Sequence, residues 1–114
     1  MISNRILQTT VDGLKAISRV DLCIVDADKN VAAKTFDNVS ECLADAISFI
    51  DSPAESQAVN GFQFFKVEDE GNLEYIIMAR GTSDDVYMVG KLTAFQIQLS
   101  LIHISEPTRQ AEIS

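Results

Sequence analysis

The chain has 114 residues, which suffices for one domain with a single core but not for a sensor and an effector domain together. A hydrophobic content of 46% is typical of a globular protein, so the composition excludes a disordered chain. The formal net charge of -8 argues against direct nucleic-acid binding, because gripping phosphates needs a basic patch. No apolar run approaches the roughly 20 residues of a membrane span, and the first residues lack the layout of a secretory signal. We therefore expect a cytoplasmic protein with no membrane contact.

The first predicted element is a helix over Asn4–Ser18, which Ser3 or Asn4 would cap. It carries an apolar stripe at helical spacing, made of Ile6, Leu7, Val11, Leu14 and Ile17. One apolar face usually packs on a core, so we expect this helix to cover a sheet. The alternative is a helix used for dimerisation or signalling.

Two strands and a second helix are predicted next. Asp21–Asp26 is apolar on both faces, which is typical of a strand with something packed on each side. Ala27–Asn30 has the composition of a turn, and Val31–Thr35 returns as the partner strand. Asn38–Glu41 resembles a capping box with Asn in the place of Ser or Thr, and it predicts a helix through about Ile50.

The following stretch is predicted to be a helical turn, three strands and a last helix. Ser52–Glu55 places proline where a helix would begin, and only a turn or two fits before Asn60-Gly61. Three runs rich in β-branched and aromatic residues, separated by turn residues, then predict strands over Phe62–Val67, Leu73–Arg80 and Asp85–Gly90. Connections this short suit antiparallel neighbours. The last helix would begin at Lys91.

These elements predict an α+β fold with an antiparallel five-stranded sheet and flanking helices. The predicted order is helix, two strands, helix, three strands, helix. GAF, PAS, profilin-like and roadblock-type modules share this general plan, and they bind small ligands or each other. A shared plan of this kind says little about function.

The end of the chain has an unusual sequence. Leu99–Arg109 reads LSLIHISEPTR, which resembles the in-frame translation of a common transposase sequencing adapter. We therefore expect a regulatory domain over residues 1–98 and a tail over 99–114 that is not native, with the natural gene continuing past Gln98. The single histidine, His103, lies in this tail, so no catalytic or metal site is built on it.

No constellation of reactive residues is present in the sequence. The glycines are isolated turn residues rather than a phosphate-binding loop, and no Ser-His-Asp or Cys-His set remains without His103. The carboxylates lie mostly in turns. Cys23 and Cys42 are too few and too far apart for a metal site and have the character of reduced, buried residues, although a disulfide between them stays an alternative. We expect neither an enzyme nor a bound cofactor or metal.

The stretch Asn4–Gln98 resembles the amino-terminal domain of bacterial transcriptional regulators of the sugar-diacid (CdaR) and PucR type. The phrases that carry the resemblance are Ile6–Leu14, Leu22–Asp26, Asp51–Gln57, Gly61–Val67 and Asp85–Lys91. In that family a sensory domain at the front is followed by a carboxy-terminal helix-turn-helix. The resemblance implies that this chain senses a metabolite or relays a signal, while the DNA-binding part is missing from it.

A small anionic metabolite such as a sugar acid would need basic partners, because guanidinium and ammonium groups bind carboxylates. The candidates at or beside the sheet are Arg80, Lys66 and Lys91. Arg80 precedes Gly81-Thr82-Ser83, where backbone groups and the Ser83 hydroxyl could join it. Tyr87 could line the same pocket, as could Tyr75, although strand aromatics are more often core. The predicted ligand-binding set is Arg80, Lys66, Tyr87 and Ser83.

Two hypotheses therefore stand. The first is a ligand-sensing domain of a regulator, which predicts a concave pocket with convergent polar groups between sheet and helix. The second is a roadblock-like dimerisation or interaction module without a ligand. It predicts a filled core and an exposed apolar face on the first or last helix. A homodimer is expected in either case.

Overall fold

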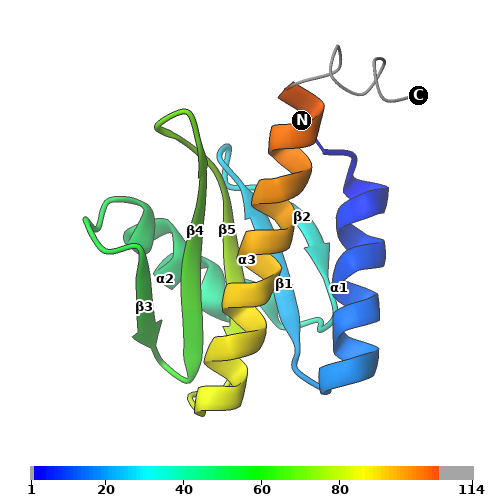
Figure 1. Cartoon of the computed structure of the whole chain (residues 1–114). Helices are drawn as coiled ribbons and strands as arrows, with labels where there is room; N and C mark the ends of the chain where they lie inside the picture. Colours follow the sequence, from blue (N-terminus) through cyan, green and yellow to red (C-terminus); the bar gives the residue numbers. More distant parts are fainter. Residues whose placement is uncertain (1, 106–114) are drawn as a thin grey trace.

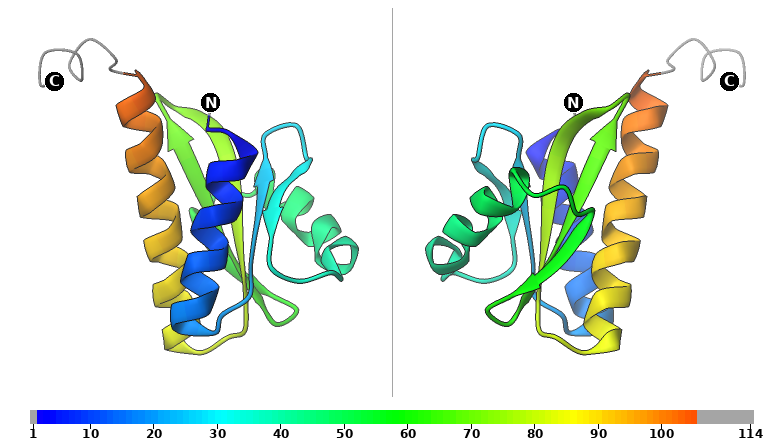
Figure 2. Two further views of the ribbon diagram at one scale, coloured as in Figure 1. Left: turned by 90° about the vertical axis from the view of Figure 1, so that its right-hand side faces the viewer. Right: turned by 90° about the vertical axis from the view of Figure 1, so that its left-hand side faces the viewer.

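A computed structural model describes residues 2–105 and shows a five-stranded sheet between two layers of helices (Figure 1). The elements are α1 (Asn4–Ser18), β1 (Leu22–Asp26), β2 (Val31–Lys34), α2 (Val39–Ile50), β3 (Ser56–Val59), β4 (Phe62–Asp69), β5 (Asn72–Arg80) and α3 (Asp84–Ser105). The strand order is β2-β1-β5-β4-β3, and every neighbouring pair is antiparallel. Helices α1 and α3 lie side by side on one face, and α2 covers the other (Figure 2). The predicted α+β fold is confirmed.

The strand predicted over Asp85–Gly90 is wrong, because these residues form the start of α3. Ser83 begins the helix: its Oγ accepts a hydrogen bond from the Val86 amide at 3.3 Å, and its carbonyl accepts one from the Tyr87 amide. Asp84 and Asp85 lie in the first turn, where the helix dipole favours negative charge. The strand composition of this run is overridden by these start signals.

The helical turn predicted over Ser52–Glu55 is also wrong, and a fifth strand was missed beside it. Ser56–Val59 forms β3 and pairs with β4 through a two-residue hairpin. Asn60 and Gly61 both have positive φ, 52° and 83°, as a tight hairpin turn requires. One misplaced strand and one missed strand cancel, so the predicted order of elements matches the observed one.

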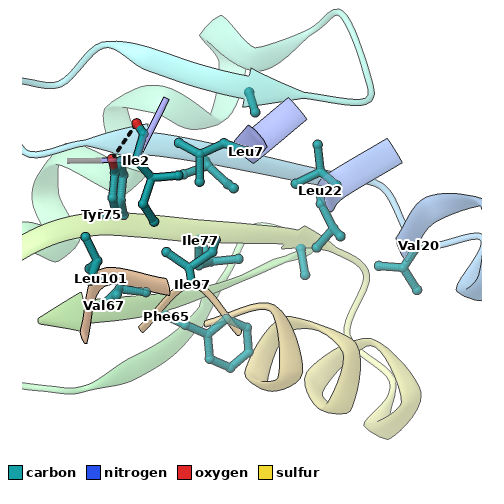
Figure 3. Packing of buried hydrophobic residues seen from close by; sticks show 14 residues of the cluster. Ile2, Leu7, Val20, Leu22, Phe65, Val67, Tyr75, Ile77, Ile97 and Leu101 are labelled. Atoms are coloured by element: carbon teal, nitrogen blue, oxygen red, sulfur yellow. Dashed lines mark hydrogen bonds between the residues drawn. The ribbon is translucent and has the colours of Figure 1, made fainter. Parts of the chain in front are cut away.

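The sheet separates two apolar clusters. The larger one lies between the sheet and helices α1 and α3 (Figure 3). It includes Leu7, Phe65, Ile77 and Ile97, and the Tyr75 hydroxyl donates to the Ile2 carbonyl at 3.5 Å. The second cluster packs against α2. Strand β1 contributes to both, as its apolar faces predict. Every buried side-chain nitrogen and oxygen of the described residues has a hydrogen-bond partner.

Helix α1 packs on the sheet with part of its predicted stripe. Leu7 and Val11 are buried and Leu14 is half-buried, whereas Ile6 and Ile17 are exposed. The predicted bounds of α1 agree with the structure. For α2, Asn38 occupies the N-cap position, but its side chain makes no capping hydrogen bond, so the capping-box detail is wrong.

Helix α3 approaches the sheet very closely at one glycine. A Cβ atom at Gly90 would lie 2.1 Å from Cε1 of Phe65, a buried ring on β4. Only glycine permits this contact, which presses the first half of α3 against β4. The helix continues through Leu99–Ser105, and Leu101 is buried in the larger cluster. Residues 106–114 lie outside the described residues, and the adapter origin of the tail stays a prediction.

Candidate functional site

Two of the predicted ligand-binding residues, Arg80 and Lys66, are engaged within the protein. The Arg80 guanidinium lies 4.9 Å from the ring centroid of Phe36 and 5.7 Å from that of Phe62. It also forms an ion pair with Asp21 at 3.7 Å. Lys66 donates to the Ser52 carbonyl. Its ammonium lies 5.0 Å from the ring centroid of Phe49, which is on α2.

The other two predicted residues belong to the start of α3. Ser83 caps the helix, as described above, and Tyr87 packs edge-on against Phe65 with 5.4 Å between ring centroids. The four side chains therefore do not converge on one point. Lys66 and Tyr87 line a common groove, but the Lys66 ammonium lies against α2 on the other face of the sheet. Anion binding by this set stays a prediction.

Asp21 links α1 to the sheet. Its carboxylate accepts hydrogen bonds from Lys15 of α1 and from the Thr35 hydroxyl, and it pairs with Arg80. Partial burial raises the pKa of Asp21, but these hydrogen bonds and the two positive charges outweigh it and leave the pKa below its ordinary value. This cluster has a structural role.

Both cysteines are buried thiols in the cluster beneath α2. Burial, together with the nearby Cys42, raises the pKa of Cys23 to about 12. The Cys23 thiol is therefore protonated near neutral pH and is a poor nucleophile. Within residues 2–105, no group of three or more His, Cys, Asp and Glu side chains is placed to hold a metal ion.

A groove of about 810 Å³ lies between α3 and the outer part of the sheet. It is lined by Glu55, Phe65, Lys66, Glu68, Asp84, Tyr87, Met88, Lys91, Leu92, Ala94, Phe95 and Gln98. Its α3 wall contains large apolar side chains that are unusually exposed: Met88 at 63%, Leu92 at 55% and Phe95 at 60%. Helix α3 thus presents buried residues to the core and a second apolar stripe outward. An exposed apolar face on the last helix is what the interaction-module hypothesis predicts.

The strand predicted over Asp85–Gly90 hides this outward stripe in the sequence. Read as one helix, residues 84–98 place Met88, Leu92 and Phe95 at intervals of four and three, which is one side of a helix. The stripe continues through Leu99 and Ile102. Those two residues fall in the adapter-like tail, whereas Met88, Leu92 and Phe95 lie before it.

The two edges of the sheet differ. At β2, the Gln8 side chain of α1 occupies the edge: its Nε2 donates to the Lys34 carbonyl at 2.7 Å, and its Oε1 accepts from the Lys34 amide at 3.1 Å. At this residue an amide side chain thus takes the place of a neighbouring strand.

At the other edge, β3 has no neighbouring strand on its outer side among the described residues. The Lys66 amide donates to the Glu55 carbonyl, so Glu55 directs its backbone groups toward β4. Successive residues of an antiparallel strand direct these groups alternately toward and away from the partner, so those of Ser56 and Ala58 point away from β4. Gln57 and Ala58 are exposed, and β3 carries no charged side chain. An uncharged strand with outward backbone groups is suited to pairing with another strand.

No family model and no curated protein matches this sequence. Among solved structures, Myxococcus xanthus MglB is similar with a TM-score of 0.59 and 8% sequence identity. The match covers 89% of this chain and 91% of that chain. At this identity the likeness shows the fold alone, and the fold is roadblock-like.

No helix among the described residues combines the length and the apolar character needed to cross a bilayer.

Proposed function

We propose that this chain is a roadblock-like interaction module that forms a homodimer through its β3 edges and works by binding rather than by catalysis. The observation that carries the proposal is the difference between the two sheet edges. Gln8 occupies the β2 edge, whereas Ser56 and Ala58 leave donors and acceptors available at β3. Two antiparallel β3 strands would join two sheets into one.

Hydrogen bonds alone would give such a dimer little net affinity. Two outward residues on each strand give four bonds, each with a net contribution of about 0.5–1.5 kcal/mol, against an association cost of roughly 4 kcal/mol or more. Apolar side chains beside the edge would supply the remainder. Leu43, Ile50, Val59 and Phe62 are only partly buried on the α2 side of the sheet. A second copy would cover side chains of this kind.

The test is the molar mass in solution, measured by light scattering during gel filtration, for the native chain and for Ala58→Pro. The substitution removes an amide that points away from β4, so the internal sheet keeps its hydrogen bonds. We expect a dimer for the native chain and a monomer with an unchanged circular dichroism spectrum for Ala58→Pro. The control is Ala58→Thr, which keeps the amide and should stay dimeric. A native monomer, or a dimeric Ala58→Pro, would refute the proposal.

A second candidate is the sensory domain of a CdaR/PucR-type regulator that binds a small anionic metabolite. The support is the groove: about 810 Å³ falls within the range of roughly 300–1,000 Å³ usual for small-molecule sites. Lys91, Tyr87 and Gln98 supply polar groups to it. A ligand that binds the folded form must raise the unfolding temperature. Thermal unfolding with a panel of sugar acids and purine catabolites tests this, and flat curves across the panel would count against it.

A cytoplasmic location suits either function. Two buried thiols fit a reducing compartment.

A further inference from the structure

We propose that the groove beside α3 binds an amphipathic helix of a partner protein, with an apolar face and a rim of Lys and Arg. This site is separate from the proposed dimer contact. The groove opens on the α1/α3 face of the sheet, while the β3 backbone groups point outward in the plane of the sheet. Both contacts could therefore form at once.

The layer of helices on this face is incomplete. Helix α1 contacts β1 and β2, and α3 contacts β4 and β5, but no helix within residues 2–105 lies over β3 on this side (Figure 1). The groove follows α3 from Asp84 to Gln98, which is about 21 Å at 1.5 Å per residue. A helix of about four turns would match that length. It would lie beside α3 as α3 lies beside α1.

The apolar wall has the spacing of a helix-packing surface. Met88, Leu92 and Phe95 are each more than half exposed, and Tyr87 continues the surface towards Phe65. Scattered exposed apolar side chains are ordinary, but a contiguous set of large ones along a groove marks a contact surface. Side chains four and three residues apart form the ridge against which a second helix packs.

The charges at the rim select the partner. Glu55, Glu68 and Asp84 are exposed acidic residues of the groove. Both ion pairs found among the described residues involve Asp21, so neither neutralises these three carboxylates. The Lys66 ammonium lies on the other face of the sheet, which leaves Lys91 as the basic group of the lining that is placed to oppose them.

An acidic rim favours a basic partner over a second copy of this chain. Two copies would bring acidic rims together, and the chain as a whole has a charge of -8. A helix with Lys and Arg beside its apolar face would instead place its charges near Glu55, Glu68 and Asp84. This pattern is the helix-in-groove mode of recognition.

The experiment measures fluorescence anisotropy of two designed helical peptides of about 18 residues, enough to span the groove. Both carry Leu on one face, and they differ only in having Lys or Glu beside it. We expect the Lys peptide to bind at least about tenfold more tightly than the Glu peptide, a difference of about 1.4 kcal/mol. Equal binding of the two, or no binding of the Lys peptide, would overturn the proposal.

Protein variants separate the groove from general attraction to an acidic surface. Leu92→Glu should weaken binding of the Lys peptide at least about tenfold. The matched control is Ile17→Glu, which adds the same charge at an exposed apolar site on α1 and should change nothing. Asp84→Lys should weaken binding, whereas Asp12→Lys on α1 should have a smaller effect. Equal losses at groove and control sites would overturn the proposal, as would a dimer that Leu92→Glu converts to a monomer.

Discussion

The two sides of α3 carry similar apolar residues, but one side is buried and the other is exposed. The inner side is fully buried at Ile97 and fits β4 so closely that Gly90 has no room for a methyl group. The outer side exposes Met88, Leu92 and Phe95. Apolar character alone therefore does not decide which side of a helix is core. The sheet supplies a partner for one side, and nothing within the described residues covers the other.

The largest effect is expected for Ile97→Ala on the inner side. The side chain is 2% exposed and belongs to the main cluster, so its loss leaves a cavity. We expect the free energy of unfolding to fall by about 2–5 kcal/mol. Urea denaturation measures it. A loss below about 1 kcal/mol would mean that the site can collapse, contrary to the tight packing of α3 on β4.

Gly90→Ala should destabilise the chain by adding a methyl group instead of removing atoms. The new Cβ would lie 2.1 Å from the Phe65 ring, so either the ring or the helix must shift. We expect a loss of about 1–3 kcal/mol, as for overpacking in other cores. The control is Gly13→Ala on α1, where nothing lies within 4 Å. That substitution should stabilise the helix by about 0.5–1 kcal/mol.

Acid should weaken the attachment of α1 while leaving the packing of α3 unchanged. The pKa of Asp21 is lower in the folded chain than in the unfolded chain. Its contribution to the free energy of unfolding is therefore complete when the pH is above the pKa of the unfolded chain. It is lost as the pH falls from about 4 through the folded pKa. Asp21→Asn should therefore flatten the dependence of stability on pH in this range. An unchanged profile for that variant would contradict the assignment.

Leu92→Ser on the outer side should have the smallest effect on folding. The side chain is 55% exposed, so its replacement should change the free energy of unfolding by no more than about 0.5 kcal/mol. Its effect on binding of the Lys peptide should be much larger. A stability loss close to that of Ile97→Ala would show that the outer stripe belongs to the core.

The sequence predicts the longer regular elements well. The Asn4–Ser18 helix has the observed bounds, and β1 differs by one residue, because each shows a clear apolar pattern. The two errors concern short segments. The run Val86–Val89 is compatible with a strand or a helix. The capping hydrogen bond to Ser83 favours the helix. β3 is a short edge strand of mixed residues, for which the Asn60-Gly61 hairpin was the available signal.

The candidate site was harder to predict than the fold. Arg80 and Lys66 were chosen for their charge, but their partners Asp21, Phe36 and Phe49 are distant in the sequence. No local pattern reveals such pairing. The groove is lined by Phe65 of β4 and by residues of α3, two segments that the fold brings together. Its apolar wall becomes visible in the sequence only after residues 84–98 are assigned to one helix.

The Gln8 side chain also limits how far copies of this molecule could assemble. If β3 joins two copies about a twofold axis, both β3 edges are used up, and at each remaining β2 edge the Gln8 amide already bonds the outward backbone groups of Lys34. Growth into a filament would require that amide to leave. Gln8 would then favour a dimer over a continuous sheet built from many copies.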